Sequence, residues 1–262
     1  MVVRQGSDES LAGLRVVAYR VRVWIRVRFY AELVDLTGDA EVEVPLGRSR
    51  SVKDLIEAIG VPHPEVALIV VDGEPVDFDH LVTGGESVAV YPPFRSLDLS
   101  DVTTVAPAPV PPRFVLDVHL GTLARRLRLL GFDCWYRTDV DDVQLADVAV
   151  TERRILLTRD RGLLMRRVIT HGYCPRSDDP DRQALEVVQR FQLAGRLAPM
   201  TRCVHCNGRL RTVAKADVLD RLPPRTRSEF DDFVQCERCT QVYWPGSHVD
   251  EVDDFVARAA AV

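Results

Sequence analysis

Three aspartates stand where a parallel sheet could bring their carboxylates together. Asp117 follows the short apolar run 114–116, and Asp160 follows the apolar run 155–157 within ERRILLTRDRGLL. Short continuous apolar runs are typical of strands buried on both faces of a parallel sheet, and ligands collect at the carboxyl edge of such sheets. Asp142 begins the helical stretch DVQLADVAV ahead of the second strand. Clustered carboxylates repel one another unless a hard divalent cation neutralises them, so these residues predict a metal site.

Asp160 also has a simpler interpretation. It comes directly before the segment 161–164, where a helix is expected to begin, and aspartate is a common N-cap residue. The presence of Asp117 at the end of another strand favours the metal-site interpretation. For Asp160 taken alone, both interpretations remain open.

Four of the six cysteines form two CxxC pairs separated by 29 residues. They are Cys203, Cys206, Cys236 and Cys239. Two such pairs can close one tetrahedral thiolate site for a structural Zn²⁺, and disulfides or redox pairs are the alternatives. His205 or His248 could replace one of these ligands. Cys134 and Cys174 lie outside the pairs and are expected to be small buried residues.

The segments around the aspartates predict alternating strands and helices. A helix over about 119–130 follows the first strand and ends at Gly131, with five apolar residues on one face and three arginines away from it. The apolar residues are Leu120, Leu123, Ala124, Leu127 and Leu130, and the arginines are Arg125, Arg126 and Arg128. Strands are expected at 133–137 and near Tyr173, and a further helix at Pro180. This alternation indicates an α/β domain with a parallel sheet.

The amino-terminal part has a different order of elements. Alternating residues predict strands at 22–29 and 41–44 with a turn around 36–39, and strands follow at 68–71 and 87–91. Ser51 and Gly60 are expected to cap a helix over 52–59. This order is that of a β-grasp α+β domain, and the stretch 22–94 resembles the ubiquitin-like fold of the sulfur carriers ThiS and MoaD. Those carriers end in an activated Gly-Gly, whereas Gly84-Gly85 is internal here, so a binding or scaffolding module is expected.

Residues 95–112 are rich in proline and small residues, the composition of a stiff, extended linker. We therefore expect few contacts between the flanking domains, and we expect the part from about Arg113 onward to fold and function alone. Residues 1–112 have a net charge of −7 and residues 113–262 one of +2, giving −5 in total. RNA binding would thus need local arginine patches. Without an apolar run of membrane length or a signal-peptide pattern, we expect a cytoplasmic protein with no membrane partner.

Residues 113–250 resemble the Mut-seven C-terminal RNase domain, a PIN-like nuclease fold followed by a zinc ribbon. The resemblance rests on FVLDVHLGTLARRLRLLGFD, ERRILLTRDRGLL, RCVHCN and CERCTQVYWPGSH, which stand in the family's order. A ubiquitin-like domain often precedes this domain in bacterial members. The implied division is a β-grasp domain over 22–94, a linker over 95–112, a PIN-like RNase domain over 113–198 and a zinc ribbon over 199–250.

The resemblance implies a metal-dependent ribonuclease in which Asp117, Asp142 and Asp160 hold Mg²⁺ or Mn²⁺ and hydrolyse RNA phosphodiester bonds. The four paired cysteines would hold a structural Zn²⁺. Typical PIN domains have one more acid on a central helix, which the stretch 120–130 lacks. Asp139 or Asp178 could replace that acid.

Arg159 and Arg161 flank Asp160 and are candidates to hold RNA phosphates, although solvated surface arginines are an equal alternative. Trp244 could stack on a base or, as we prefer, pack against the zinc knuckle. The missing acid favours a second hypothesis, a catalytically inactive module that binds RNA or, through its ubiquitin-like domain, a protein partner. The three retained aspartates favour the ribonuclease.

Overall fold

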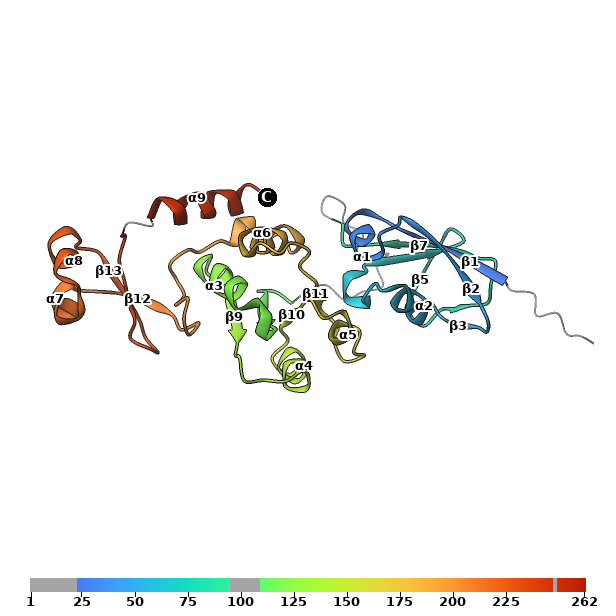
Figure 1. The fold of residues 1–262 in the computed structure, drawn as a ribbon, viewed down its shortest axis with the longest axis horizontal. Helices are drawn as coiled ribbons and strands as arrows, with labels where there is room; N and C mark the ends of the chain where they lie inside the picture. Colours follow the sequence, from blue (N-terminus) through green and yellow to red (C-terminus); the bar gives the residue numbers. More distant parts are fainter. Residues whose placement is uncertain (1–22, 95–108, 247–248) are drawn as a thin grey trace, which may run out of the picture.

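The computed structural model of the 262-residue chain describes residues 23–94, 109–246 and 249–262. A β-grasp domain forms one end of the molecule, an α/β domain the middle, and a three-stranded ribbon the other end (Figure 1). The last helix, α9, returns from the ribbon to the α/β domain. No helix among the described residues is both long and apolar enough to cross a membrane.

The β-grasp domain is built on a five-stranded mixed sheet in the order β2-β1-β7-β4-β5. Its central strands β1 and β7 are parallel, and the remaining pairs are antiparallel. The strands are β1 (Val23–Phe29), β2 (Glu41–Leu46), β4 (Leu68–Val71), β5 (Glu74–Val76) and β7 (Ser87–Tyr91). Two short strands, β3 (Arg50–Ser51) and β6 (Leu81–Val82), pair separately. The predicted β-grasp order is confirmed.

The helix of this domain, α2 (Val52–Ile59), has the predicted ends. The Ser51 hydroxyl accepts the Asp54 N–H at 3.1 Å, and Gly60 ends the helix with a φ of +108°. The predicted turn around 36–39 is wrong in part. The chain between β1 and β2 forms two short helices, η1 (Ala31–Leu33) and α1 (Val34–Thr37), because Leu33 and Leu36 are buried in the core.

The α/β domain contains a parallel four-stranded sheet in the order β11-β10-β8-β9. Its strands are β8 (Arg113–Leu116), β9 (Asp133–Tyr136), β10 (Ile155–Leu157) and β11 (Gly172–Tyr173). Its helical segments are η3 (Val118–Leu120), α3 (Gly121–Leu129), α4 (Asp142–Thr151), α5 (Arg161–Leu164), α6 (Pro180–Arg190) and η4 (Ala194–Arg196).

The two faces of this sheet are buried against different helices. Phe114 and Leu157 pack in one apolar cluster with residues of α3 and α6, while Val115 and Leu156 pack in another with residues of α4. The connection from β8 to β9 and the connection from β9 to β10 therefore cross opposite faces. In an open α/β sheet this arrangement creates a switch point, here between β8 and β10, where ligands commonly bind.

The β-grasp and α/β domains pack directly on one another, so the expectation of few contacts between them is wrong. One apolar cluster contains Ile56 and Val61 of the first domain together with Leu163 and Ile169 of the second. The 3-10 helix η2 (His63–Glu65) lies against β11. The composition of a linker describes the linker itself and not the faces of the domains that it joins. The α/β part therefore has a buried face that would be exposed if it were produced alone.

The ribbon consists of antiparallel strands β12 (Leu210–Val213), β13 (Phe233–Cys236) and β14 (Val242–Tyr243). Three short helical segments lie between β12 and β13: α7 (Lys215–Val218), η5 (Leu219–Arg221) and α8 (Pro224–Glu229). A last helix, α9 (Val249–Ala260), follows the ribbon and was not predicted from the sequence. It packs on the α/β domain through the buried Phe255 and Ala259, and Asp181 of α6 forms ion pairs with Arg126 and Arg258.

Candidate active site and zinc site

Asp117 and Asp160 lie at the carboxyl edge of the α/β sheet, on either side of the switch point. Asp117 follows β8 directly, and its N–H donates to the Leu157 carbonyl of β10 at 3.1 Å. Asp160 comes three residues after the end of β10. The prediction that two neighbouring strands bring an aspartate to one edge of the sheet is thus confirmed by the strand pairing.

Thr158 joins these two aspartates through its hydroxyl, which is fully buried. Its Oγ1 donates to Asp117 Oδ2 at 2.7 Å and accepts the Asp160 N–H at 2.9 Å. Thr158 was not among the residues predicted to form the site. Its position could have indicated this function, because Thr158 is a polar residue that directly follows the buried apolar run 155–157. A buried hydroxyl needs hydrogen-bond partners, and the aspartates on either side provide them.

Asp160 is an N-cap, as its simpler interpretation predicts. Its Oδ1 accepts the Gly162 N–H at 2.7 Å and the Leu163 N–H at 3.2 Å at the start of α5. Both hydrogen bonds use the same carboxylate oxygen, so Oδ2 lies outside them. The cap therefore orients this carboxylate and leaves one of its oxygens for another ligand.

Asp142 lies apart from this pair. It is the first residue of α4, after the N-cap Asp141, and its Oδ2 is 3.7 Å from an Arg166 nitrogen. The structure does not gather the three aspartates into a group of metal ligands, since in the described part of the chain such a group is found only among cysteines. Neither proposed replacement acid forms such a group with them among the described residues, and Asp139 pairs with Arg137 and Asp178 with Arg159.

The two arginines beside Asp160 have different surroundings. Arg159 is about half exposed and pairs with the exposed Asp178, so it can exchange that partner for another anion. Arg161 instead reaches into the β-grasp domain, where its Nη1 donates to the Leu36 carbonyl at 2.7 Å and to the Gly60 carbonyl at 3.4 Å. Arg161 is therefore a contact between domains, which the sequence did not indicate.

The four paired cysteines converge on one point, with all their sulfur atoms within 4.8 Å of one another. The Sγ atoms of Cys203 and Cys239 are 3.6 Å apart, and those of Cys206 and Cys236 are 3.4 Å apart. Tetrahedral Zn²⁺ with Zn–S bonds of about 2.3 Å places its sulfurs about 3.8 Å apart, so these residues fit zinc. A Cβ at Gly208 would lie 2.8 Å from the Cys236 sulfur, which leaves room there for glycine alone.

The surroundings of Cys203 favour a thiolate, whereas burial and hydrogen bonds with the neighbouring cysteines raise the pKa values of Cys206 and Cys239. Burial raises the pKa of the Cys203 thiol, but hydrogen bonds from Tyr243 and from backbone N–H groups outweigh burial and lower it to about 7. Backbone N–H groups of Arg238 and Cys239 also donate to the Cys236 sulfur, both at 3.4 Å. His205 does not belong to the group, and His248 lies outside the described residues.

Arg128 contradicts the prediction that it points away from the buried face of its helix. It is only 4% exposed, and its guanidinium donates to the carbonyls of Cys134, Val204 and His205. Asn207 adds a second link, since its Oδ1 accepts the Cys134 N–H at 3.0 Å. A long side chain can reach past its own helix, and here it satisfies carbonyls of the zinc knuckle. The knuckle thereby covers the edge strand β9. Cys134, on this strand, is buried as predicted, and so is Cys174 elsewhere in the α/β domain.

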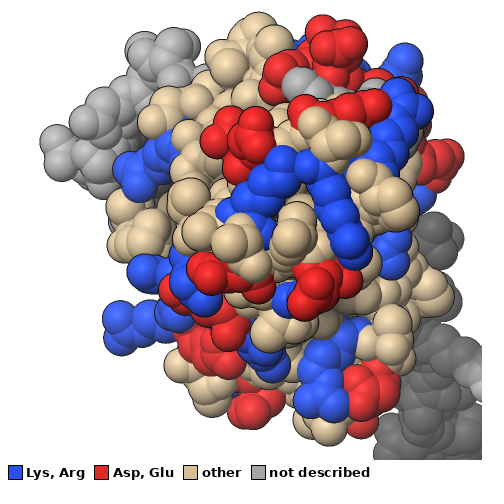
Figure 2. Space-filling view, turned by 90° about the vertical axis from the view of Figure 1, so that its left-hand side faces the viewer, with Lys and Arg blue, Asp and Glu red and all other residues tan. Residues whose placement is uncertain are grey.

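On the ribbon end of the molecule, the described residues of the face in view form no uniformly basic track. Figure 2 shows the Lys and Arg side chains of this face interspersed with Asp and Glu. Trp244 is partly buried, and its ring lies 6.5 Å from that of Phe233 in the apolar cluster of the ribbon. It therefore packs inside the ribbon, and its packing against the zinc knuckle stays a prediction.

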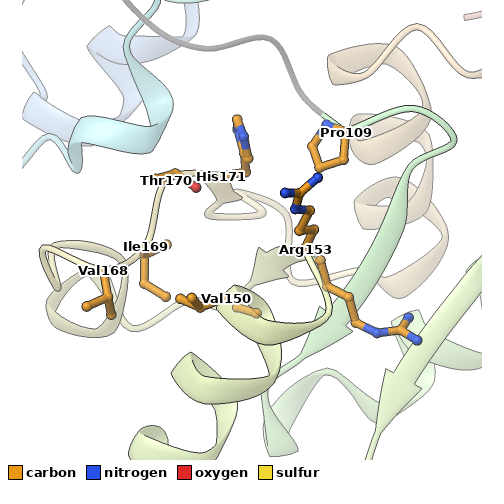
Figure 3. Close-up of a pocket in the computed structure, with 9 residues that line it drawn as sticks. Pro109, Val150, Arg153, Val168, Ile169, Thr170 and His171 are labelled. Carbon is orange, nitrogen blue, oxygen red and sulfur yellow. The ribbon is translucent and has the colours of Figure 1, made fainter.

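A separate pocket of about 400 Å³ opens at the opposite, amino-terminal edge of the sheet (Figure 3). Its walls include Pro109, Val150, Arg153, Thr170 and His171. It contains none of the candidate acids, so the aspartate site and this pocket are distinct.

Comparison with known families agrees with this architecture. Residues 112–256 match the Mut7-C RNAse domain, and residues 22–98 match the Mut7-C ubiquitin domain. The first match covers more than half of the chain, so the protein belongs to the Mut7-C RNAse domain family and has a nuclease-like domain preceded by a ubiquitin-like one.

No curated protein matches the chain. Among solved structures, small archaeal modifier protein 1 of H. volcanii is 17% identical, and a protein assigned as molybdopterin converting factor, subunit 1, of Pyrococcus furiosus is 30% identical. Each match covers 28% of this chain and 99% of the other, with a TM-score of 0.24. These scores are too low to support an argument about function.

Proposed function

We propose that this protein is a ribonuclease that hydrolyses RNA phosphodiester bonds at the carboxyl edge of its α/β sheet. The observation that carries the proposal is the pair Asp117 and Asp160, held by one buried hydroxyl at the switch point of the sheet. Membership of the Mut7-C RNAse domain family supports this reaction class. The RNA is the proposed partner, and the cytoplasm the proposed compartment.

The pair offers the carboxylate oxygens that a hard divalent cation prefers. Asp117 Oδ1 and Asp160 Oδ2 lie outside the hydrogen bonds that orient the two carboxylates. Mg²⁺ is commonly bound through one or two carboxylates together with waters and substrate phosphates. When bound, Mg²⁺ or Mn²⁺ supplies an activated water and neutralises charge that develops on the phosphate. Asp142 is the proposed third carboxylate. To join the site, its side chain would have to break the ion pair with Arg166.

The remaining residues have supporting functions. Thr158 orients Asp117, and the start of α5 orients Asp160, so both carboxylates are held before substrate arrives. Arg159 can exchange Asp178 for an RNA phosphate, because both partners are exposed and the pair is weakly held. Arg161 is occupied by the β-grasp domain and is no longer proposed to contact RNA.

The test is cleavage of mixed RNAs in Mg²⁺ or Mn²⁺ by the full chain and by Asp117→Asn and Asp160→Asn. Each substitution should reduce cleavage by at least about 100-fold, because a metal ligand loses its charge. Asp160→Asn should keep its melting temperature within about 2 °C, since asparagine caps helices about as well as aspartate. Asp147→Asn, an exposed change on α4, is the matched control and should cleave normally. Full cleavage by Asp160→Asn would contradict the assignment.

A second candidate function is an inactive module that binds RNA or a protein partner. The pairing of Asp142 with Arg166 favours it, because that carboxylate is engaged away from the other two. Binding of RNA by the wild-type chain without cleavage in either metal would support this alternative.

A further inference from the structure

The turn that carries Asp160 is attached to the β-grasp domain. Arg161, the next residue, donates through Nη1 to the carbonyls of Leu36 and Gly60 at 2.7 and 3.4 Å. These carbonyls lie at the ends of α1 and α2, and neighbouring residues of the two domains share one buried apolar cluster. The carboxyl ends of both helices therefore face the cation, where the helix dipole favours positive charge.

The helix that follows Asp160 cannot hold this turn alone. α5 has only four residues, and isolated helices of that length are unstable in water. Its first residue is Arg161, so the contact with the β-grasp domain fixes the same turn that orients the Asp160 carboxylate.

The β-grasp domain also supports the strand beside β10. The Glu65 carboxylate, fully buried, accepts the Cys174 N–H at 2.7 Å just after β11. β11 in turn holds the end of β10, since the Tyr173 carbonyl accepts the Thr158 N–H at 3.2 Å. The β-grasp domain thus supports the candidate site in two places. Arg161 holds the turn that contains Asp160, and Glu65 holds the strand that pairs with Thr158.

We infer that the β-grasp domain is a structural part of the active site, with Arg161 as the positioning residue that sets the geometry of Asp160. This inference rests on the proposed function. Loss of a residue that orients a metal ligand commonly costs about 10-fold to 100-fold in metal affinity or activity. Arg161→Met should therefore raise the Mn²⁺ concentration needed for half-maximal cleavage by about 10-fold or more, with a smaller effect of Arg161→Lys, which keeps the charge.

The experiment measures two properties of the full chain: Mn²⁺ affinity without RNA, and cleavage as a function of Mn²⁺ concentration. The variants are Arg161→Met and Arg161→Lys, with Arg167→Met as the control because Arg167 is exposed six residues further along the chain. A merely structural function would lower the melting temperature without changing the Mn²⁺ affinity of the folded protein. Should Arg161→Met not fold, Arg161→Lys decides on the same two readouts.

The outcomes separate the inference from the proposed function. Weaker Mn²⁺ binding by folded Arg161 variants, partly rescued in the lysine variant, supports the inference. Mn²⁺ affinity equal to that of Arg167→Met overturns it, even where the wild-type chain cleaves RNA and Asp160→Asn does not. Absence of cleavage by the wild-type chain defeats the proposed function, whereas the relative Mn²⁺ affinities still decide the inference.

Discussion

Glu65→Gln should destabilise the whole protein by breaking the buried ion pair between the two domains. The Glu65 side chain is 0% exposed and that of Arg176 16%, and the shortest distance between their charged groups is 2.8 Å. Burial alone lowers the pKa of Arg176, but the charge of Glu65 and its hydrogen bonds outweigh burial and raise it. Removing one partner of a buried pair costs about 3–5 kcal/mol.

Glutamine keeps one carbonyl oxygen, which can accept from either Arg176 or the Cys174 N–H but cannot fully replace both interactions. We therefore expect the lower end of this range, about 3 kcal/mol. For a chain of this size each kcal/mol lowers the melting temperature by about 2–4 °C, so the expected decrease is about 6–12 °C. The assay is thermal unfolding of the full chain, followed by circular dichroism.

The matched control is Glu43→Gln on β2, whose ion pair with Arg26 is exposed and 3.7 Å long. Exposed pairs contribute about 0–1 kcal/mol, so the control should melt within a few degrees of wild type. A decrease of less than about 2 °C in Glu65→Gln would refute the reasoning that this pair joins the domains.

The remaining predictions concern zinc and the loop before β7. Purified protein should contain about one zinc per chain, and Cys236→Ser or chelation should expose residues 199–246 to protease; an unchanged digestion pattern would contradict a structural zinc. Burial raises the pKa of Glu86, but hydrogen bonds from Thr83 and Gly84 outweigh it and lower the pKa to about 2 from 4.5. The carboxylate therefore stabilises the folded state above about pH 4.5, and this contribution is lost as the pH falls toward about 2. Glu86→Gln should thus melt below wild type at pH 6, with a difference that shrinks by pH 3; a constant difference would argue against the shift.

Periodicity and capping residues were sufficient to predict the main strands of the two larger sheets and the helices α2 to α6, but not the short helices between β1 and β2 or the last helix α9. The sequence predicted α2 with both its caps, because Ser51 and Gly60 act through local backbone groups. It also predicted that Asp117 and Asp160 share one sheet edge, since buried apolar runs indicate parallel strands and parallel strands align their carboxyl ends. The cysteine spacing predicted the grouping that the structure contains.

Long side chains that cross between elements were the part that local pattern could not predict. Arg128 and Arg161 looked like surface arginines because helical periodicity reports where a Cβ points, not where a guanidinium five bonds further on finds acceptors. Glu65 belonged to no motif, and its function depends on Arg176, which lies 111 residues away. Asp142 shows the same limit, since its place on α4 was predicted and its pairing with Arg166 was not.

Two structural features argue against a carrier function for the ubiquitin-like domain. A carrier needs a free terminal Gly-Gly, whereas here Gly84 has a φ of +118° and its N–H is held by Glu86 at 2.6 Å. A carrier must also leave its partner enzyme, whereas Glu65 is buried in the α/β domain of its own chain. Separation would leave Arg176 without its counter-ion, at a cost of several kcal/mol. A β-grasp fold attached in this way acts as a fixed support for the α/β domain. Its contact with Arg161 holds the turn that contains Asp160, and its contact with Cys174 holds the end of β11.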